Sequence, residues 1–170
     1  DRLLIRFSSQ ENPFFWTPFA TNTAGSLRIG TGSEIVTAVK TRREIIVLTD
    51  TSVHSMQFIG PPFTFGINQL ASNITVRGFN TAVAVGDAVF WMGYDRFYIY
   101  DGRVQVIPCS VRDHVFQDFN ETQSDKVYAG VNSAFGEVFW FYPSATNSGA
   151  NGGTDENDKY VVYNYDQKIW

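Results

Sequence analysis

The stretch from Thr81 to Pro108 alternates apolar strands with short polar breaks. The run VFWM (89–92) is apolar at every position, which predicts a strand that is buried on both faces. RFYIY (96–100) and RVQVI (103–107) alternate better, which predicts strands nearer the surface. Asp101-Gly102 predicts a type I′ hairpin turn, because that turn needs positive φ at both central residues. A buried strand followed by antiparallel strands that are more exposed to solvent predicts one blade of a β-propeller.

Two other stretches repeat this organisation, so the approximate repeats span 34–60, 81–108 and 126–170. EIIVL (44–48) and EVFWFY (137–142) are the buried strands expected in the first and third repeats. We predict an all-β fold of antiparallel β-propeller-like blades, a partial propeller, forming a single domain over 1–170. About three blades fit, whereas a closed ring usually needs four or more. We therefore expect either a segment of a longer chain, with the rest of the ring outside it, or blades that pair with another subunit. An ordinary antiparallel sandwich with a chance periodicity is the alternative.

The spacing between equivalent residues predicts an inserted loop in the third repeat. Trp91 and Trp140 are 49 residues apart (140 − 91), whereas Asp101 and Asp166 are 65 apart (166 − 101). The difference of 16 equals the length of the polar run SATNSGANGGTDENDK (144–159). This run has no apolar anchor, which favours a polar contact with a neighbouring subunit or with a channel. The candidate contact residues are Ser144, Asn147, Asn151, Asp155, Glu156, Asp158 and Lys159.

Three further elements are expected outside the repeated strands. A short helix is predicted over Ser110–Gln123, with an apolar face that packs onto the sheet and a capping box from Ser110 to Asp113. FFW (14–16) is expected to fill an apolar gap under its loop. Residues 63–67 and 74–76 are expected to be short extended pieces of a connecting segment.

The composition describes a globular chain with a mildly acidic surface. The chain of 170 residues is 44% hydrophobic and 18% charged, with a formal net charge of −4 and a pI near 5.1. The negative charge gives no electrostatic argument for tight nucleic-acid binding. No apolar run reaches the roughly 18 residues that a membrane span needs.

The residues that might carry chemistry favour structural interpretations. Asp155–Asp158 departs from the spacing and glycine of a calcium loop, and His54 and His114 have no cysteine partner for zinc. Cys109 has no nearby base. The carboxylates of Asp50, Asp95 and Asp101 lie in predicted turns, where aspartate is favoured by hydrogen bonds to its own backbone. We therefore predict no catalytic residue, metal site or cofactor, and no enzymatic activity.

The aromatic residues of the predicted buried strands have two possible roles. Stacking on sugars or bases is one role, and packing in the core is the other. Their place on strands expected to be buried favours the core. These residues are Phe90, Trp91, Phe139, Trp140 and Phe141.

Several of these runs together resemble a family of phage proteins. The runs are LLIRFSSQENPFFW (3–16), EIIVLTDTSVHSMQFIGPPFTF (44–65) and NTAVAVGDAVFWMGYDRFYIYDGRVQVIPCSVRDHVF (80–116). They resemble the propeller-bearing nozzle, tail-tube or packaged-DNA stabilisation proteins in the tails of short-tailed bacteriophages. The features that carry the resemblance are W-x-G-x-D-x-F-x-x-Y-D-G from Trp91 to Gly102, the strand ending in Leu48-Thr49-Asp50, and the helix after Pro108.

The resemblance implies a structural virion protein located in the tail and made in the host bacterial cytoplasm. It implies a homo-oligomer, a hexameric ring, below the portal and adaptor and in contact with other tail proteins. Genomic DNA would pass through the ring with weak contacts, being retained before ejection and guided during it. Two alternatives from other classes remain: a carbohydrate-binding or hydrolytic propeller of a tail fibre or cell surface, and a scaffold that binds peptides at its blade edges.

Overall fold

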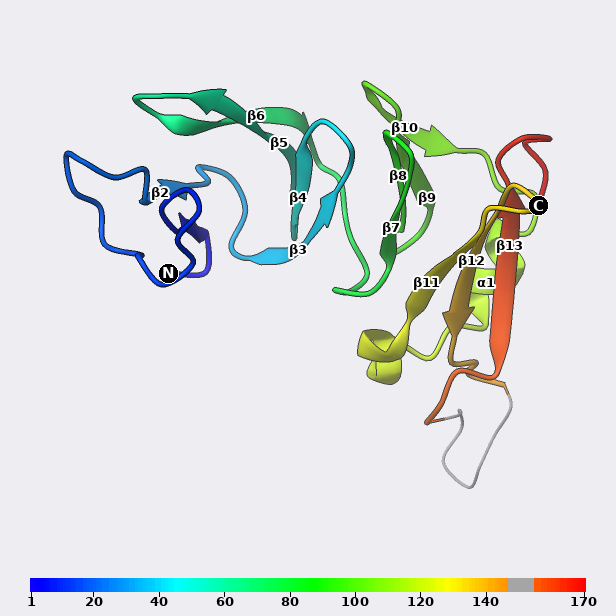
Figure 1. The fold of residues 1–170 in the computed structure, drawn as a ribbon. Coiled ribbons are helices and arrows are strands. Elements are labelled where there is room, and N and C mark those ends of the chain that lie inside the picture. Colours follow the sequence, from blue (N-terminus) through cyan, green and yellow to red (C-terminus); the bar gives the residue numbers. More distant parts are fainter. Residues whose placement is uncertain (147–154) are drawn as a thin grey trace. The chain divides into compact units, whose positions relative to one another are not determined.

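The computed structural model describes residues 1–146 and 155–170. Within these residues the fold is all-β, with four antiparallel sheets, one short α-helix and one 3₁₀ helix (Figure 1). The chain divides into two compact units, Asp1–Ile74 and Thr75–Trp170. Each unit has its own sheets and hydrophobic core, and each is described by itself.

The first unit contains a two-stranded and a four-stranded sheet. The four-stranded sheet is a simple meander in the order β3-β4-β5-β6, in which each strand pairs antiparallel with the next along the chain. The strands of this unit are β1 (Leu4–Phe7), β2 (Gly25–Arg28), β3 (Ile35–Lys40), β4 (Ile45–Thr49), β5 (Ser52–Gly60) and β6 (Thr64–Ser72).

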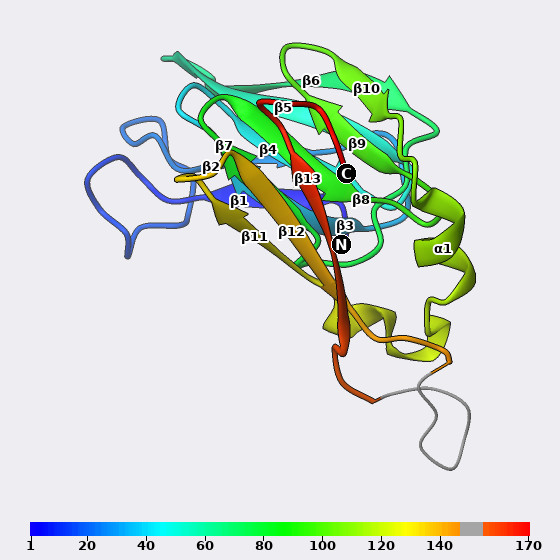
Figure 2. The ribbon, with the colours of Figure 1, turned by 90° about the vertical axis from the view of Figure 1, so that its right-hand side faces the viewer.

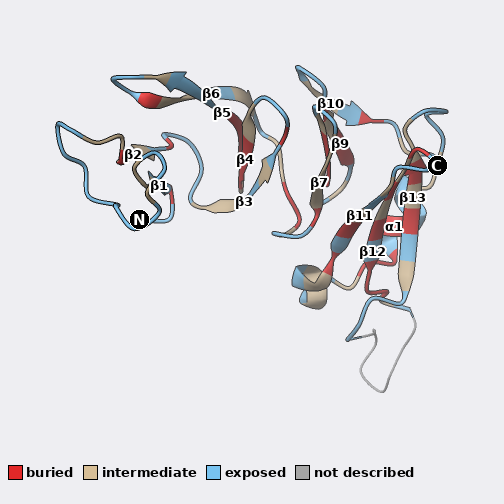
Figure 3. Ribbon diagram, viewed as in Figure 1, coloured by how far each residue is buried: buried red, intermediate tan, exposed pale blue. Residues whose placement is uncertain are grey.

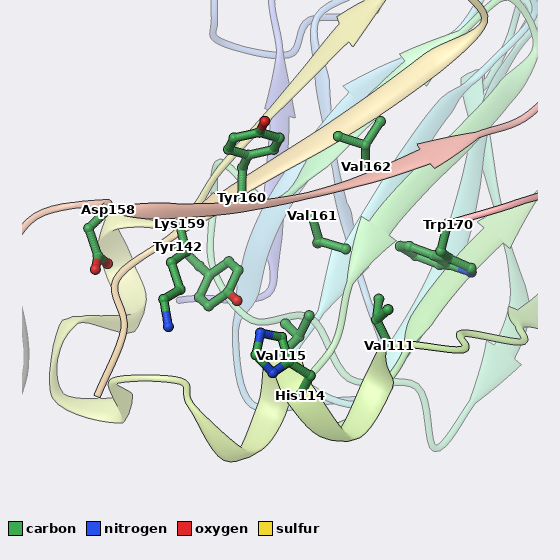
Figure 4. Close-up of a pocket in the computed structure, with 10 residues that line it drawn as sticks. All are labelled: Val111, His114, Val115, Tyr142, Asp158, Lys159, Tyr160, Val161, Val162 and Trp170. Atoms are coloured by element: carbon green, nitrogen blue, oxygen red, sulfur yellow. The ribbon is translucent and has the colours of Figure 1, made fainter. Parts of the chain in front are cut away.

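A core forms in the first unit from residues of both sheets. Leu3 and Ile29 from the β1–β2 region pack with Val47 of β4 and Met56 of β5. The run IIVLT of β4 is almost entirely buried, as its continuous apolar pattern predicts (Figure 3). Burial of β-branched and aliphatic side chains on both faces therefore fixes β4 in the interior of its sheet.

The second unit contains a four-stranded meander and a three-stranded meander, in the orders β10-β9-β8-β7 and β11-β12-β13. In Figure 2 the chain passes from β10 through α1 and a short 3₁₀ helix before it enters β11. The elements are β7 (Ala82–Val85), β8 (Ala88–Met92), β9 (Phe97–Tyr100), β10 (Val104–Ile107), α1 (Arg112–Gln117), the 3₁₀ helix (Glu121–Lys126), β11 (Tyr128–Asn132), β12 (Glu137–Tyr142) and β13 (Lys159–Asn164).

The core of the second unit is aromatic and joins both of its sheets to α1. The ring of Phe97 in β9 lies 4.8 Å from that of Trp140 in β12 and 4.5 Å from that of Trp170. Val115 of α1 is buried in the same cluster, and Val111 and Phe116 pack against it. The apolar face predicted for the helix is thus confirmed. Trp91 and Trp140 are both fully buried, as expected for core residues.

The predicted helix is confirmed in place but not in length or capping. The α-helix covers only Arg112–Gln117, and a separate 3₁₀ helix, which is itself kinked at Gln123, follows it. The N-cap is Val111, without a side-chain cap hydrogen bond, so the capping box from Ser110 was wrong. Asn120 instead caps the 3₁₀ helix, because its side chain accepts a hydrogen bond from the Thr122 backbone N–H.

Two predictions of strand burial were wrong. β9 was expected near the surface, but Phe97, Tyr98 and Tyr100 are buried, because β9 is an interior strand of its sheet. β12 was expected to be buried on both faces, but only one of its faces packs into the core. Phe139 and Phe141 lie on the other face, and Phe141 is 38% exposed. Alternate residues of a strand point to opposite faces, so the continuous apolar run hid this division.

Three local predictions also differ from the structure. The turn after Tyr100 has three residues, since Tyr100 pairs with Val104, and it is therefore not a two-residue type I′ turn. Residues 64–72 form β6, a full fourth strand, rather than part of a connecting segment. The aromatic run at 14–16 is exposed, with Phe14 at 89%, so it does not fill a gap under its loop.

Candidate functional site: the neck of the 144–159 loop

The loop predicted at residues 144–159 leaves the end of β12 and returns into β13. Its neck is built against the segment that follows α1. Phe119 and Ser144 form an isolated antiparallel bridge, and the Asn120 N–H donates to the Pro143 carbonyl over 3.0 Å. The Ala145 N–H donates to the Asp118 carbonyl over 2.7 Å. Backbone hydrogen bonds thus continue the sheet beyond β12 and hold the start of the loop.

Asp118 joins the two ends of this neck. Its carboxylate accepts hydrogen bonds from the Thr146 N–H over 3.0 Å and from the Thr146 hydroxyl, and it forms an ion pair with the Lys159 ammonium. Burial works to raise the pKa of Asp118, but the hydrogen bonds from Lys159 and Thr146 outweigh it and lower that pKa below its ordinary value. Asp118 is therefore a charged anchor between the outgoing and returning chain.

A second carboxylate closes the neck from the returning side. Both the N–H and the hydroxyl of Ser144 donate to the Asp158 carboxylate, each over 2.7 Å. Ser144 is fully buried, so this pairing satisfies polar atoms that have no access to solvent. Burial, reinforced by the charges of Asp118 and Asp158, raises the pKa of the nearby Tyr142 phenol to about 12. Tyr142 therefore stays neutral at physiological pH.

The acidic part of the loop is held by the 3₁₀ helix. Lys126 pairs with the Glu156 carboxylate over 3.0 Å and also donates to the Asp155 carbonyl. The Asn157 side-chain amide donates to the Lys126 carbonyl over 2.7 Å. These contacts are exposed, so they orient the loop without adding much stability.

The predicted contact residues thus fall into groups with different surroundings. Ser144, Asp158 and Lys159 belong to the neck, whereas the side chains of Asp155 and Glu156 are largely exposed. Asn147 and Asn151 lie outside the described residues. Sequence reasoning missed Asp118, which is 26 residues before Ser144 (144 − 118), because nothing in its local pattern distinguishes it from other helix-flanking aspartates.

The turn aspartates have structural partners. The Asp50 carboxylate accepts the N–H and hydroxyl of Ser33 over 2.8 and 2.7 Å, and these bonds lower its pKa. The Asp95 carboxylate is paired with Arg96 over 2.6 Å, which lowers the pKa of Asp95, and Arg112 of α1 donates to the Asp95 carbonyl over 2.7 Å. Asp50 and Asp95 therefore lie in bends, as predicted, but their carboxylates bond to Ser33 and to Arg96, whereas the prediction expected hydrogen bonds to the backbone of their own turns.

The histidines occupy the positions expected of packing and surface residues. His54 on β5 is buried next to the Thr31 hydroxyl at 3.0 Å, and burial lowers its pKa, so it is neutral at physiological pH. His114 is exposed on α1. Across residues 1–146 and 155–170, no three His, Cys, Asp or Glu side chains gather closely enough to hold a metal ion.

The chain was compared with models of known protein families and with curated proteins. No family model matches it, and no curated protein matches it either. Among the described residues, no helix is long and apolar enough to cross a membrane. The fold defines the class, an antiparallel all-β protein with blade-like sheets.

Proposed function

We propose that this protein is a structural component of a bacteriophage tail, a nozzle or packaged-DNA stabilisation protein that forms a ring around the DNA channel. Its role is mechanical: the sheets form a rigid wall that retains packaged DNA and guides its ejection. The resemblance in sequence supports this proposal, and so does the repeated up-and-down arrangement of three- and four-stranded antiparallel sheets. Its partners would be copies of itself, most simply six in a ring, the portal and adaptor, and passing DNA.

The observation that carries the proposal is an uncovered aromatic surface on a well-packed unit. On the outer face of β12 and β13, the rings of Phe139, Phe141 and Tyr160 lie 5.8 to 6.1 Å from one another. Tyr128 of β11 pairs with Phe141 across the same sheet, and Tyr128 and Tyr160 are each more than half exposed. Contiguous apolar surface of this kind marks a protein contact, as expected for a subunit of a larger assembly.

The mild negative charge suits a channel through which DNA must slide. Affinity for DNA comes mainly from Lys and Arg on phosphates, and this chain has 13 of them against 17 acidic residues. We expect binding to free duplex DNA to be weak and to fall further as salt rises. Tight binding at physiological salt would contradict the proposed role as a non-adhesive wall.

Native mass spectrometry and electron microscopy of the purified protein test the ring directly. We expect a closed ring with an open channel, and a protein that stays monomeric beside its tail partners would overturn the proposal. Phe141→Ser removes an aromatic ring from the exposed face without opening the core, so it should weaken assembly and leave the melting temperature nearly unchanged. Phe135→Ser, in the exposed turn between β11 and β12, is the matched control and should still assemble.

The carbohydrate-binding alternative receives no support from the tryptophans of the repeats. Trp91 and Trp140 are fully buried, so neither ring can stack on a sugar.

A further inference from the structure

Exposed apolar side chains of the first unit gather at one end. Apart from Leu4, every large hydrophobic residue of this unit that is exposed comes from the β1–β2 connection or the β5–β6 hairpin. The Thr64 hydroxyl in the hairpin donates to the Thr23 carbonyl over 3.3 Å, and both segments line one hollow of about 390 Å³, so they lie side by side (Figure 1). We call the exposed aromatic residues of these segments the aromatic tip: Phe14, Phe15, Trp16, Phe19, Phe58 and Phe63.

The rings of the aromatic tip stand out from the unit. Phe14 is 89% exposed and Phe63 is 73% exposed. The segments 13–19 and 58–63 contain no charged residue, and each contains two prolines, which restrict φ and stiffen the chain. Contiguous apolar surface of this kind marks a site of contact with a membrane or with another protein.

The first half of the β1–β2 connection satisfies its own hydrogen-bonding groups. The Asn12 side-chain oxygen accepts the Phe14 N–H over 3.1 Å, and the Asn12 carbonyl accepts the Phe15 N–H over 3.3 Å. The indole N–H of Trp16 donates to the Pro13 carbonyl over 2.7 Å. The N–H groups nearest the rings are therefore paired within the loop itself.

Asn22 has the same role in the second half of the connection. Its side-chain oxygen accepts the Phe19 N–H over 3.0 Å, and its amide donates to the Thr17 carbonyl over 2.9 Å. In water such groups could bond to solvent, whereas in an apolar medium each unpaired group is costly. Internal pairing therefore lets this loop leave water without losing hydrogen bonds.

A basic turn adjoins the aromatic tip. Lys40, Arg42 and Arg43, in and next to the β3–β4 turn, are exposed and line a pocket together with Phe58. Glu44, the acidic residue of the same turn, accepts hydrogen bonds from side chains of β5. The charge beside the rings is thus mainly positive, which complements anionic lipid headgroups.

We propose that the aromatic tip and the adjoining basic turn bind the interface of an anionic lipid bilayer. The rings enter the boundary between headgroups and acyl chains, and Lys40, Arg42 and Arg43 contact lipid phosphates. A bilayer fits these features better than a protein does, because fluid acyl chains surround protruding rings without a complementary surface. The contact is peripheral, and the inference does not depend on the proposed ring.

Flotation with vesicles made of equal parts of phosphatidylcholine and phosphatidylglycerol tests the proposal. We expect the purified protein to float with these vesicles. The double substitution Phe14→Ser and Phe63→Ser should weaken binding by at least roughly tenfold and leave the melting temperature unchanged, because both rings are exposed. Phe135→Ser removes a similarly exposed ring from the second unit and should bind as the unsubstituted protein does.

The charge of the basic turn is tested separately. Arg42→Ser should weaken binding to the anionic vesicles by about fivefold and leave binding to pure phosphatidylcholine vesicles unchanged. Arg103→Ser, in the exposed turn between β9 and β10, is the matched control and should have no effect. Equal losses from Arg42→Ser and Arg103→Ser would contradict the assigned role of the basic turn.

The fluorescence of Trp16 identifies the part of the protein that enters the bilayer. Brominated lipids quench a nearby indole, and Trp91 and Trp140 are fully buried. We expect quenching in the unsubstituted protein and its loss in Trp16→Phe. No flotation, or quenching that persists in Trp16→Phe, would overturn the proposal. An oligomer in lipid-free solution that Phe14→Ser and Phe63→Ser dissociate would overturn it too, because a second copy would then cover the tip.

Discussion

The indole Nε1 of Trp140 donates a hydrogen bond to the carbonyl oxygen of Thr81 over 2.9 Å, and both residues are fully buried. The bond joins β12 to the residue just before β7, so it connects the two sheets of the second unit. Trp91, at the matching position of its own repeat, donates to the carbonyl of Thr75 over 3.2 Å. In both repeats the tryptophan thus fills the core and satisfies a backbone carbonyl.

Trp140→Phe should destabilise the second unit by roughly 2–4 kcal/mol. The change leaves a cavity and deprives the buried Thr81 carbonyl of its donor, and the two costs act together. Urea unfolding followed by circular dichroism measures the loss. Trp16→Phe is the control, because Trp16 is exposed and its indole donates to Pro13 within one loop. Equal stability of the two variants would contradict the assigned role of the Trp140 hydrogen bond.

The stability of the loop neck should depend on pH through the carboxylate of Asp118. Because its folded-state pKa lies below the ordinary value of 3.8, the contribution of Asp118 is fully present above about pH 4 and is lost as pH falls through the lowered pKa. Asp118→Asn should remove part of this acid dependence and lower stability at neutral pH by roughly 1–3 kcal/mol. Melting temperatures measured at a series of pH values from about 2.5 to about 7 provide the test.

Asp113→Asn is the matched control for this acid dependence, because the Asp113 side chain on α1 is 77% exposed. Its profile should follow that of the unsubstituted protein. An Asp118→Asn profile that also follows it would show that the ion pair with Lys159 does not hold the neck.

Gly136 should tolerate alanine less well than Gly86 does. Both glycines have positive φ, 68° and 63°, so alanine is strained at either position. A Cβ at Gly136 would also collide with the Asp166 carboxylate, whereas a Cβ at Gly86 meets nothing within 4 Å. We expect roughly 1 kcal/mol of destabilisation for Gly86→Ala and at least about 2 kcal/mol for Gly136→Ala. Denaturant midpoints in the reverse order would contradict this account.

Arg77 should not be replaceable by lysine. Its buried guanidinium lies 4.0 Å from the centre of the Phe119 ring, pairs with Glu121 and donates to the Tyr94 carbonyl. Lysine cannot reproduce the stacked, planar arrangement, so Arg77→Lys should cost roughly 2–3 kcal/mol. Glu121→Gln should cost less than about 1 kcal/mol, because the Glu121 side chain is 66% exposed. Thermal unfolding of both variants would reveal whether stacking or the ion pair matters more.

Local sequence patterns predicted most of the strands, though not the full length of β6, and where the polar loop lies. The apolar runs of β4 and β8 needed no tertiary information, because continuous burial of Val, Ile and aromatic residues leaves only an interior strand as a consistent solution. The apolar face of α1 was equally readable, since helical spacing puts Val111 and Val115 on one side. The 16-residue excess in the repeat spacing located the loop, because this spacing is counted from sequence positions alone.

Contacts between segments far apart in the chain were decided by the tertiary structure alone. Asp118 became the anchor of the neck because folding brings Thr146 and Lys159 to it, and no local pattern encodes that meeting. The exposed side of Phe141 depends on which face of β12 the neighbouring sheet covers. Period and propensity are local properties, whereas coverage of a face is set by packing. The sequence by itself therefore determined most of the strands, and the tertiary structure decided the extent of β6 and which strand faces are buried.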